Sequence, residues 1–166
     1  MNFARILRHL FTGQLAVRRI FPVSSLAAIE QAIKQSEIGH EGEIRFAVEA
    51  ALDMLPLLRD QSARERALEA FSQLRVWDTE HNNGVLIYLL LADRDVEIIA
   101  DRGINIRVGS EEWERICRQM EADFRSGHFE SGVILGIKSA GHHLQAHFPI
   151  GRQGGENELP DVPAIL

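Results

Sequence analysis

Several side chains with oxygen or guanidinium groups gather around two short segments in the middle of the chain. Asp78 and Glu80 precede Asn83 in the first segment, and Asp101 and Arg102 end the second. Carboxylate and amide oxygens are the ligands that Ca²⁺ and Mg²⁺ prefer, and a guanidinium binds phosphate oxygens in pairs. We therefore predict a divalent-metal or phosphate site. The alternative is that the Asn-Asn-Gly sequence is a turn and that the acids are solvated loop residues.

A predicted β-hairpin would bring these two segments together. Residues Val85–Leu91 (VLIYLLL) form an apolar run without polar alternation, which indicates a strand covered on both faces at the centre of a sheet. The turn formers at 92–95 separate it from a second β-favouring run, Val96–Ala100. Because the strands of a hairpin are antiparallel, the start of the first lies beside the end of the second. We expect Asn82–Gly84 to lie near Asp101–Gly103.

The first half of the chain predicts a crossover unit. A helix that ends near Gly39 precedes residues 43–49, which alternate between apolar and polar side chains, as in a strand with one better-buried face. Ser62 and Glu65 have the spacing of a capping box that opens a helix to about Leu74. A strand, a helix and a strand in this order make the two strands parallel. We predict an α/β fold, a three-layer α/β/α sandwich with a small mixed sheet that contains a central β-hairpin.

Two further helices are predicted after the hairpin. Ser110 can cap the first, whose apolar stripe includes Cys117, and the second runs from Gly127 to about Gln145 with glycines that allow close backbone approach. We expect Cys117 to be a buried packing residue, because a reactive thiol needs an exposed, electropositive setting. Trp77 and Trp113 are expected to be core anchors.

Histidines near the end of the last helix suggest a second metal hypothesis. His143 and His147 are four residues apart and so share a helix face, beside His142. A structural metal could bind there. The alternative is that these are exposed or interface histidines, because the sequence offers no third ligand nearby.

Composition indicates one globular domain and argues against some classes of function. The chain has 166 residues, of which 45% are hydrophobic and 25% charged, with a formal charge of -6. An acidic chain is not suited to general nucleic-acid binding, so no nucleic-acid partner is expected. One cysteine allows no internal disulfide, and no segment has the apolar length that spans a membrane. We expect a cytoplasmic location, with peripheral contact to the inner face of a membrane as an option.

Two flanking segments differ from the domain predicted at residues 23–150. Residues 1–22 contain four arginines, no acid and apolar residues at helical intervals, so they form a basic amphipathic segment. This segment either packs on the domain with its arginines in water or lies on an anionic membrane surface. Residues 151–166 (GRQGGENELPDVPAIL) hold glycines and prolines that we expect to prevent regular structure, leaving a tail that is disordered or strapped to the surface.

The stretch from Trp77 to Gly103 resembles the TPM-domain family. An apolar strand entered by Asn-Gly-Val-Leu follows a Trp-containing loop and leads through a charged turn to a second strand and a glycine. The resemblance extends from about Ile29 to His147 and implies an α/β/α sandwich that binds Ca²⁺ in some members. The family includes thylakoid-lumen proteins of photosystem II repair reported as acid phosphatases, bacterial membrane-anchored proteins and an auxiliary subunit of an acetylcholine-gated channel.

Two departures from the family pattern make the central stretch more charged. Asp78-Thr79-Glu80-His81 stands where members commonly have a glycine-rich loop, and Asp101-Arg102-Gly103 stands where a Gly-aromatic-Gly ending is common. Members also place an acid-rich segment before the first strand, which makes Glu43 a further candidate. The family's export signal and carboxy-terminal anchor have no counterpart in the sequence.

The resemblance implies a metal-dependent phosphatase as the first functional hypothesis. Asp78, Glu80, Asn83 and Asp101 would hold Ca²⁺ or Mg²⁺, which activates water and neutralises phosphate charge. Asp101 and Arg102 would be the catalytic residues, with Arg102 clamping the phosphate ester. The second hypothesis is a non-catalytic interaction module that assists a membrane protein or partner complex. Whether the protein is an enzyme stays open.

Overall fold

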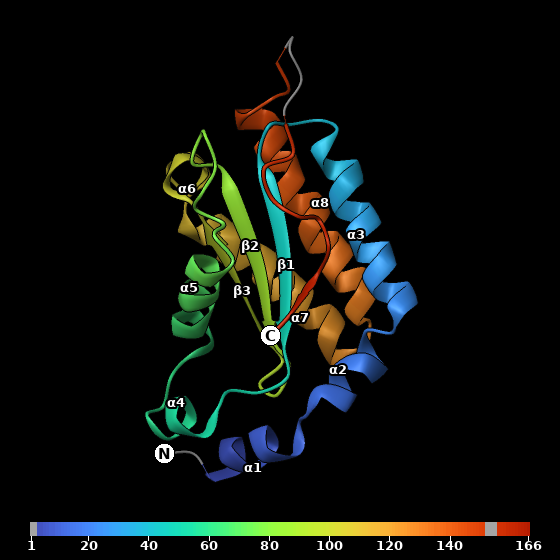
Figure 1. The fold of residues 1–166 in the computed structure, drawn as a ribbon, viewed down its shortest axis with the longest axis vertical. Coiled ribbons are helices and arrows are strands. Elements are labelled where there is room, and N and C mark those ends of the chain that lie inside the picture. Colours follow the sequence, from blue (N-terminus) through green and yellow to red (C-terminus); the bar gives the residue numbers. More distant parts are fainter. Residues whose placement is uncertain (1–2, 152–155) are drawn as a thin grey trace.

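A four-stranded sheet lies between two layers of covering structure (Figure 1). The structure, a computed structural model, describes residues 3–151 and 156–166. The strands are β1 (Glu43–Glu49), β2 (Gly84–Leu90), β3 (Asp95–Ala100) and β4 (Ala164–Ile165), in the order β3-β2-β1-β4. β1 is parallel to β2, and β3 is antiparallel to β2. The predicted α/β sandwich and mixed sheet are confirmed, with β2 inside the sheet and β3 at its edge.

Three helices cover one face of the sheet. They are α3 (Val23–Glu37), α7 (Ser110–Arg125) and α8 (Phe129–His147). Alternate residues of β1 and β2, including Phe46 and Ile87, point into this layer and belong to the larger hydrophobic cluster. Gly136 allows α7 and α8 to pack closely, because a Cβ at this position would lie 2.4 Å from Met120 Sδ. The predicted role of the α8 glycines is thus confirmed here.

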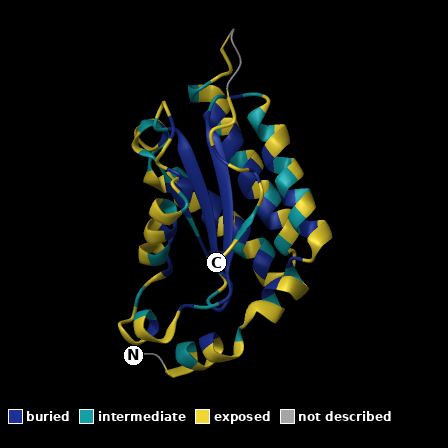
Figure 2. Ribbon diagram, in the orientation of Figure 1, coloured by how far each residue is buried: buried dark blue, intermediate teal, exposed yellow. Residues whose placement is uncertain are grey.

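The opposite face of the sheet is also closed, mainly by α5 (Ala63–Gln73). We expected one face of β1 to be better buried than the other, whereas β1 and β2 are buried along their whole lengths (Figure 2). The buried Glu49 is tolerated in this layer because its Oε2 accepts two hydrogen bonds. Tyr88 Oη donates one at 2.6 Å, and Arg66 Nε donates the other at 2.8 Å. The Ser62–Glu65 capping box that opens α5 is present with both of its hydrogen bonds.

The C-terminal tail extends the sheet, which corrects the prediction that it has no regular structure. β4 pairs in parallel with β1, and Leu166 N donates to Val48 O at 3.0 Å. Leu159 is buried in the smaller hydrophobic cluster. The proline-rich sequence still permits a strand, because β4 lies beyond its last proline. Residues 156–166 are strapped to the domain, and residues 152–155 lie outside the described residues.

Two short helices were not predicted. α4 (Met54–Leu58) has five residues, too few for an apolar period to show. α6 (Arg102–Val108) begins two residues after β3 and is capped by Asp101, whose Oδ1 accepts a hydrogen bond of 2.7 Å from Arg102 N. We had treated Asp101 only as a ligand, whereas it is also the N-cap of this helix.

The N-terminal segment forms two helices, α1 (Phe3–Phe11) and α2 (Gln14–Ile20). The expected packing with arginines in water is wrong for Arg5, whose side chain is turned to the domain and bonds Asp93 and the Gln61 carbonyl. Phe3 and Phe11 are instead exposed. Met1 and Asn2 lie outside the described residues.

The two tryptophans differ in their environments. Trp113 is 4% exposed and belongs to the core, as predicted, whereas Trp77 is 49% exposed, so its prediction as a core anchor is wrong. Val76 takes the buried position beside it, because Gly84 packs directly against the Val76 carbonyl. Cys117 is buried, as predicted, and burial raises the pKa of its thiol to about 12.

Candidate functional site

The hairpin brings its two ends together as predicted. Asp101 N donates to Gly84 O at 2.9 Å, which places the end of β3 beside the start of β2. Gly103 lies against the loop before β2, since a Cβ there would be 2.5 Å from Asn82 O and 2.6 Å from His81 O. Only a residue without a side chain fits this contact. The contact draws two backbone carbonyls to the start of α6.

Asp101 keeps one carboxylate oxygen without a partner. Its Oδ1 caps α6, whereas its Oδ2 is buried and has no hydrogen-bond partner among the described residues. A buried carboxylate oxygen without a donor is costly, and it is normally satisfied by a proton donor, a water molecule or a cation. Arg102, the first residue of α6, is exposed beside it.

Asn83 also presents a buried oxygen. Its Nδ2 donates to Glu41 O at 3.0 Å, its backbone N donates to Thr79 Oγ1 at 3.1 Å, and its side chain is fully buried. The contact with the Glu41 carbonyl fixes which end of the amide is nitrogen, because two oxygens would repel each other. Asn83 Oδ1 has no hydrogen-bond partner within the described ranges. Asn83 is therefore part of the buried framework as well as a candidate ligand.

The two remaining predicted ligands lie on the loop before β2. Asp78 and Glu80 are both exposed, and Glu80 N donates to Glu158 Oε2 at 3.0 Å. Across residues 3–151 and 156–166, no three acidic, histidine or cysteine side chains are grouped so that they could hold a metal ion. Asp78 and Glu80 thus do not join Asp101 in such a group, and the four-ligand set stays a prediction.

Two further residues at this end of the sheet were missed as candidates. His81 Nε2 lies 3.7 Å from Glu41 Oε2, and both side chains are partly accessible to solvent. Glu41 Oε1 also accepts a hydrogen bond of 2.8 Å from Gly151 N. Sequence spacing gave no sign of this pair, because parallel pairing of β1 and β2 is what places the segments before these strands side by side.

An acidic cleft of about 360 Å³ lies beside Glu41, between the end of α3 and the tail. Its lining includes Glu37, Glu43 and Asp161. Burial chiefly raises the pKa of Glu37 to about 8, and the neighbouring Glu43 and Asp161 charges raise it further. The lysine in the lining, Lys34, is engaged with Glu30 at 2.5 Å.

Glu43 has a clear structural role in this cleft. Its carboxylate accepts hydrogen bonds from Glu158 N at 3.0 Å and Leu159 N at 3.2 Å, so it holds the tail. Burial raises the pKa of Glu43, while these two amide donors oppose the rise. Both carboxylate oxygens are thereby occupied by backbone donors.

Comparisons with known proteins agree with this architecture. A family model described as the TPM domain matches residues 18–142. The chain belongs to the TPM-domain family. No curated protein matches the chain. A solved structure similar to it is the NMR structure of the BA42 protein from the psychrophilic bacterium Bizionia argentinensis, with a TM-score of 0.76 and 29% identity over 88% of this chain and 95% of that one.

The matched TPM domain extends from α2 into α8 and includes every residue predicted for the hairpin site, whereas His143 and His147 lie beyond it. α1 and the C-terminal tail lie outside the match. In the part of the chain that the structure describes, the helices are too short or too polar to cross a membrane. The division of the chain after residues 22 and 150 stays a prediction.

The histidines of α8 lie apart from the TPM hairpin residues in the sequence and have other partners. His143 Nε2 lies 2.9 Å from Glu112 Oε1 on α7, and its ring packs edge-on to Trp113. His142 is exposed. The pKa of Glu112 is lowered to about 2, chiefly by its hydrogen bonds from Arg115 and, less strongly, by His143. The contact between His143 and Glu112 joins α7 to α8.

Proposed function

We propose that this TPM domain binds Ca²⁺ or Mg²⁺ at the open end of the β2–β3 hairpin, where β2 begins and β3 ends. The observation that carries the proposal is a pair of buried oxygens, Asp101 Oδ2 and Asn83 Oδ1, that have no hydrogen-bond partner among the residues the structure describes. Both are hard oxygen donors, and the His81 and Asn82 carbonyls at Gly103 supply further donors of the kind that Ca²⁺ accepts. Asp78 and Glu80 would complete the ligand set through movement of their exposed loop.

We propose phosphate-ester hydrolysis as the reaction of this site. A divalent cation supplies a Lewis acid that polarises a phosphoryl oxygen and lowers the pKa of bound water. Arg102 is exposed next to Asp101, where its guanidinium can bind a phosphate oxygen. His81 can carry a proton, because its side chain is accessible to solvent and its Nε2 lies 3.7 Å from Glu41 Oε2.

Asp101→Asn is the variant that tests this proposal. Asparagine is as good an N-cap as aspartate, so α6 should persist while the negative charge is lost. Calorimetric titration with CaCl₂ and MgCl₂ should show binding to wild type and at least about tenfold weaker binding to Asp101→Asn. Hydrolysis of p-nitrophenyl phosphate in the same samples should require the cation and fall in Arg102→Ala. Asp123→Asn, on α7, serves as the matched control.

The outcomes separate binding from catalysis. Cation binding without turnover would refute the phosphatase reaction and keep the cation site. Absence of binding to wild type would refute the site itself. Turnover without added cation, retained in Asp101→Asn, would place the reaction elsewhere in the protein.

A non-catalytic interaction module is the second candidate function. It is favoured by α1, which lies outside the family match yet is held to the domain by specific hydrogen bonds. Such a helix adds a surface to the TPM domain. In this second function the domain, stabilised by the same cation, would assist a membrane protein or another partner complex. Binding without turnover in the experiment above is the result it predicts.

A further inference from the structure

α1 is docked with Arg5 and His9 against the domain and with most of its apolar residues in solvent, while Ile6 packs against the smaller hydrophobic cluster. Arg5 and His9 lie on one side of the helix and contact the domain, and His9 is buried. The apolar residues at positions 3, 7, 10 and 11 are spaced three or four residues apart, so they share another side of the helix, and all four are exposed. Phe3 is 71% exposed and Phe11 85%. This is the reverse of the usual packing of an amphipathic helix.

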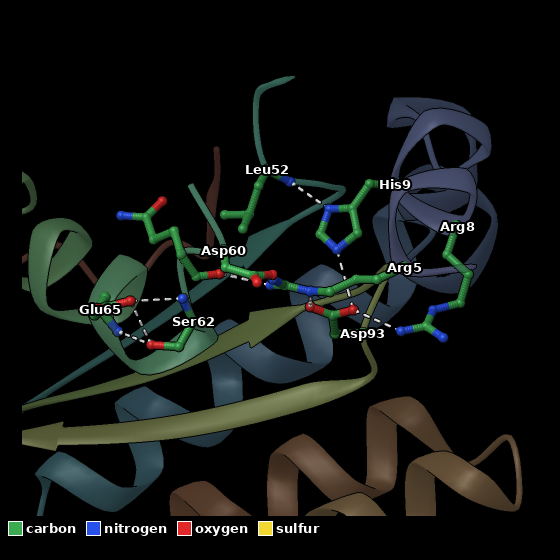
Figure 3. A network of polar contacts seen from close by, with 9 residues as sticks. Arg5, Arg8, His9, Leu52, Asp60, Ser62, Glu65 and Asp93 are labelled. Carbon is green, nitrogen blue, oxygen red and sulfur yellow. Dashed lines mark hydrogen bonds and ion pairs between the residues drawn. The ribbon is translucent and has the colours of Figure 1, made fainter. Parts of the chain in front are cut away.

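Specific contacts hold the helix in this orientation (Figure 3). Asp93 in the hairpin loop accepts from Arg5 Nε at 2.9 Å and from Arg8 at 3.1 Å. His9 Nδ1 accepts from Leu52 N at 3.0 Å, so the neutral ring carries its proton on Nε2, which lies 3.2 Å from Asp93 Oδ1. These polar contacts, from Arg5, Arg8 and His9 to Asp93 and from Leu52 N to His9, thus fix the orientation of α1.

α2 and α4 lie at the same end of the molecule as α1 (Figure 1), and they carry further exposed apolar side chains. Leu15 at the start of α2 is 81% exposed, and Leu55 on α4 is 66% exposed. α4 lies near α1, because Leu52 and Gln61 on either side of it bond His9 and Arg5. We call this surface, made by the exposed apolar residues of α1, α2 and α4, the basal surface. Its members are Phe3, Leu7, Leu10, Phe11, Leu15, Met54, Leu55 and Leu58.

Arginines surround the basal surface, although the whole chain carries a charge of -6. Arg18 and Arg19 on α2, Arg59 after α4 and Arg94 in the hairpin loop are all exposed, and within the described ranges no ion pair engages them. Arg94 lines the same cleft as Leu7 and Phe11. Residues 3–20 contain no acid, and Asp93 is occupied by the α1 network. Two exposed acids flank α4: Asp53, and Asp60, whose Oδ1 lies 3.9 Å from Arg5 Nη1, so arginines outnumber acids around the surface. An apolar surface with a basic rim has the chemistry that binds anionic lipid headgroups.

We propose that the basal surface binds an anionic lipid bilayer. Phe11 and Leu15 would enter the interfacial region, while Arg18, Arg19 and Arg94 contact lipid phosphates. The hairpin site lies at the opposite end of β2 from the loop that holds α1, so it would face away from the lipid. Lipid binding at the basal surface would require neither cation binding nor phosphatase activity.

The test uses the full chain in vesicle flotation, with vesicles of phosphatidylcholine mixed with phosphatidylglycerol and vesicles of phosphatidylcholine alone. Wild type should float with the anionic vesicles, and added salt should weaken this association. The double variant Phe11→Ser, Leu15→Ser should reduce partitioning by about tenfold or more. Arg18→Ala with Arg19→Ala should also reduce it by about tenfold. Both pairs are exposed, so the fold should persist, which circular dichroism checks.

Ile106→Ser is the matched control, because Ile106 is 82% exposed on α6 at the hairpin site. It should bind anionic vesicles within about twofold of wild type. Three results would overturn the proposal: wild type that does not float, equal binding to both kinds of vesicle, or unchanged binding of the Phe11, Leu15 double variant. Sedimentation velocity without lipid tests whether a second copy of the chain occupies the basal surface instead. A dimer that forms in wild type and is lost in the Phe11, Leu15 double variant would show this.

Discussion

Arg5 Nε donates a hydrogen bond of 2.9 Å to Asp93 Oδ2, and so joins α1 to the hairpin loop across 88 positions of the chain. Burial alone would raise the pKa of Asp93, but hydrogen bonds from Arg5, Arg8 and His9 outweigh this effect and lower it. The carboxylate is therefore charged at neutral pH and acts as the common acceptor for three basic side chains. Asp93, which the sequence indicates only as a turn residue, therefore anchors α1 to the domain.

Replacing Asp93 should release α1 without unfolding the domain. In Asp93→Asn the three basic groups lose their charged acceptor, which should lower the free energy of unfolding by about 1–3 kcal/mol. Hydrogen exchange should accelerate in the amides of α1 while those of β2 stay protected. Asp53→Asn is the control, because Asp53 is exposed and its side chain makes no capping bond to α4. Unchanged exchange in α1 would show that other contacts hold the helix.

Gly103→Ala should disturb the hairpin site through the backbone. The added Cβ would lie 2.5 Å from Asn82 O, so the loop before β2 must shift. We expect a loss of about 1–3 kcal/mol of stability, which exceeds the gain of about 1 kcal/mol from the better helix propensity of alanine. Thermal unfolding and cation titration measure the two effects. Gly13→Ala, where nothing lies within 4 Å, should change stability by less than about 1 kcal/mol.

Glu37 should make stability depend on pH. Its pKa is about 8 in the folded protein and 4.5 ordinarily, so its contribution is fully present below 4.5 and is lost as pH rises through about 8. Glu37→Gln keeps an acceptor for Ile44 N, which donates to Glu37 Oε1 at 3.0 Å, and cannot ionise. The variant should melt at least about 2 °C above wild type at the alkaline end of this range, and the difference should shrink towards its acidic end. If the melting temperatures of the variant and wild type differed by the same amount at every pH, Glu37 would not be the group that causes the pH dependence. Glu130→Gln on α8 is the exposed control.

The tail should contribute to stability through Leu159. This residue is buried in the same cluster as the α5 alanines, so Leu159→Ala should cost about 2–3 kcal/mol in urea unfolding. Val162→Ala, on the exposed part of the same segment, should stay within about 0.5 kcal/mol. If the two variants were equally stable, the tail would not be packed on the domain in solution.

Much of the central fold was predictable from sequence because its signals are local. The unbroken apolar run of β2, the turn that follows it and the Ser62–Glu65 capping box each depend on neighbouring residues. The parallel pairing of β1 and β2 then follows from the handed crossover between them. The stripe containing Trp113 and Cys117 was predicted as core for the same reason, namely its helical spacing.

What was missed depends on contacts between distant segments. β4 is a strand because β1 offers it an edge, and nothing in the tail's composition indicates this. The Glu41–His81 pair exists because two segments enter parallel strands side by side. The orientation of α1 was likewise invisible, since the period of its apolar residues defines two sides but not which one meets the domain. Asp93 decides that, from another part of the chain.

The link between α1 and Asp93 also sets an order of events during synthesis. Arg5 is translated 88 residues ahead of its acceptor, which at a synthesis rate of about 5–20 residues per second is roughly 4 to 18 seconds. During that interval neither side of the helix has its final neighbour, and the apolar side chains of residues 3–11 are accessible to any hydrophobic surface near the ribosome. The domain acquires its basal helix only after the hairpin loop has emerged.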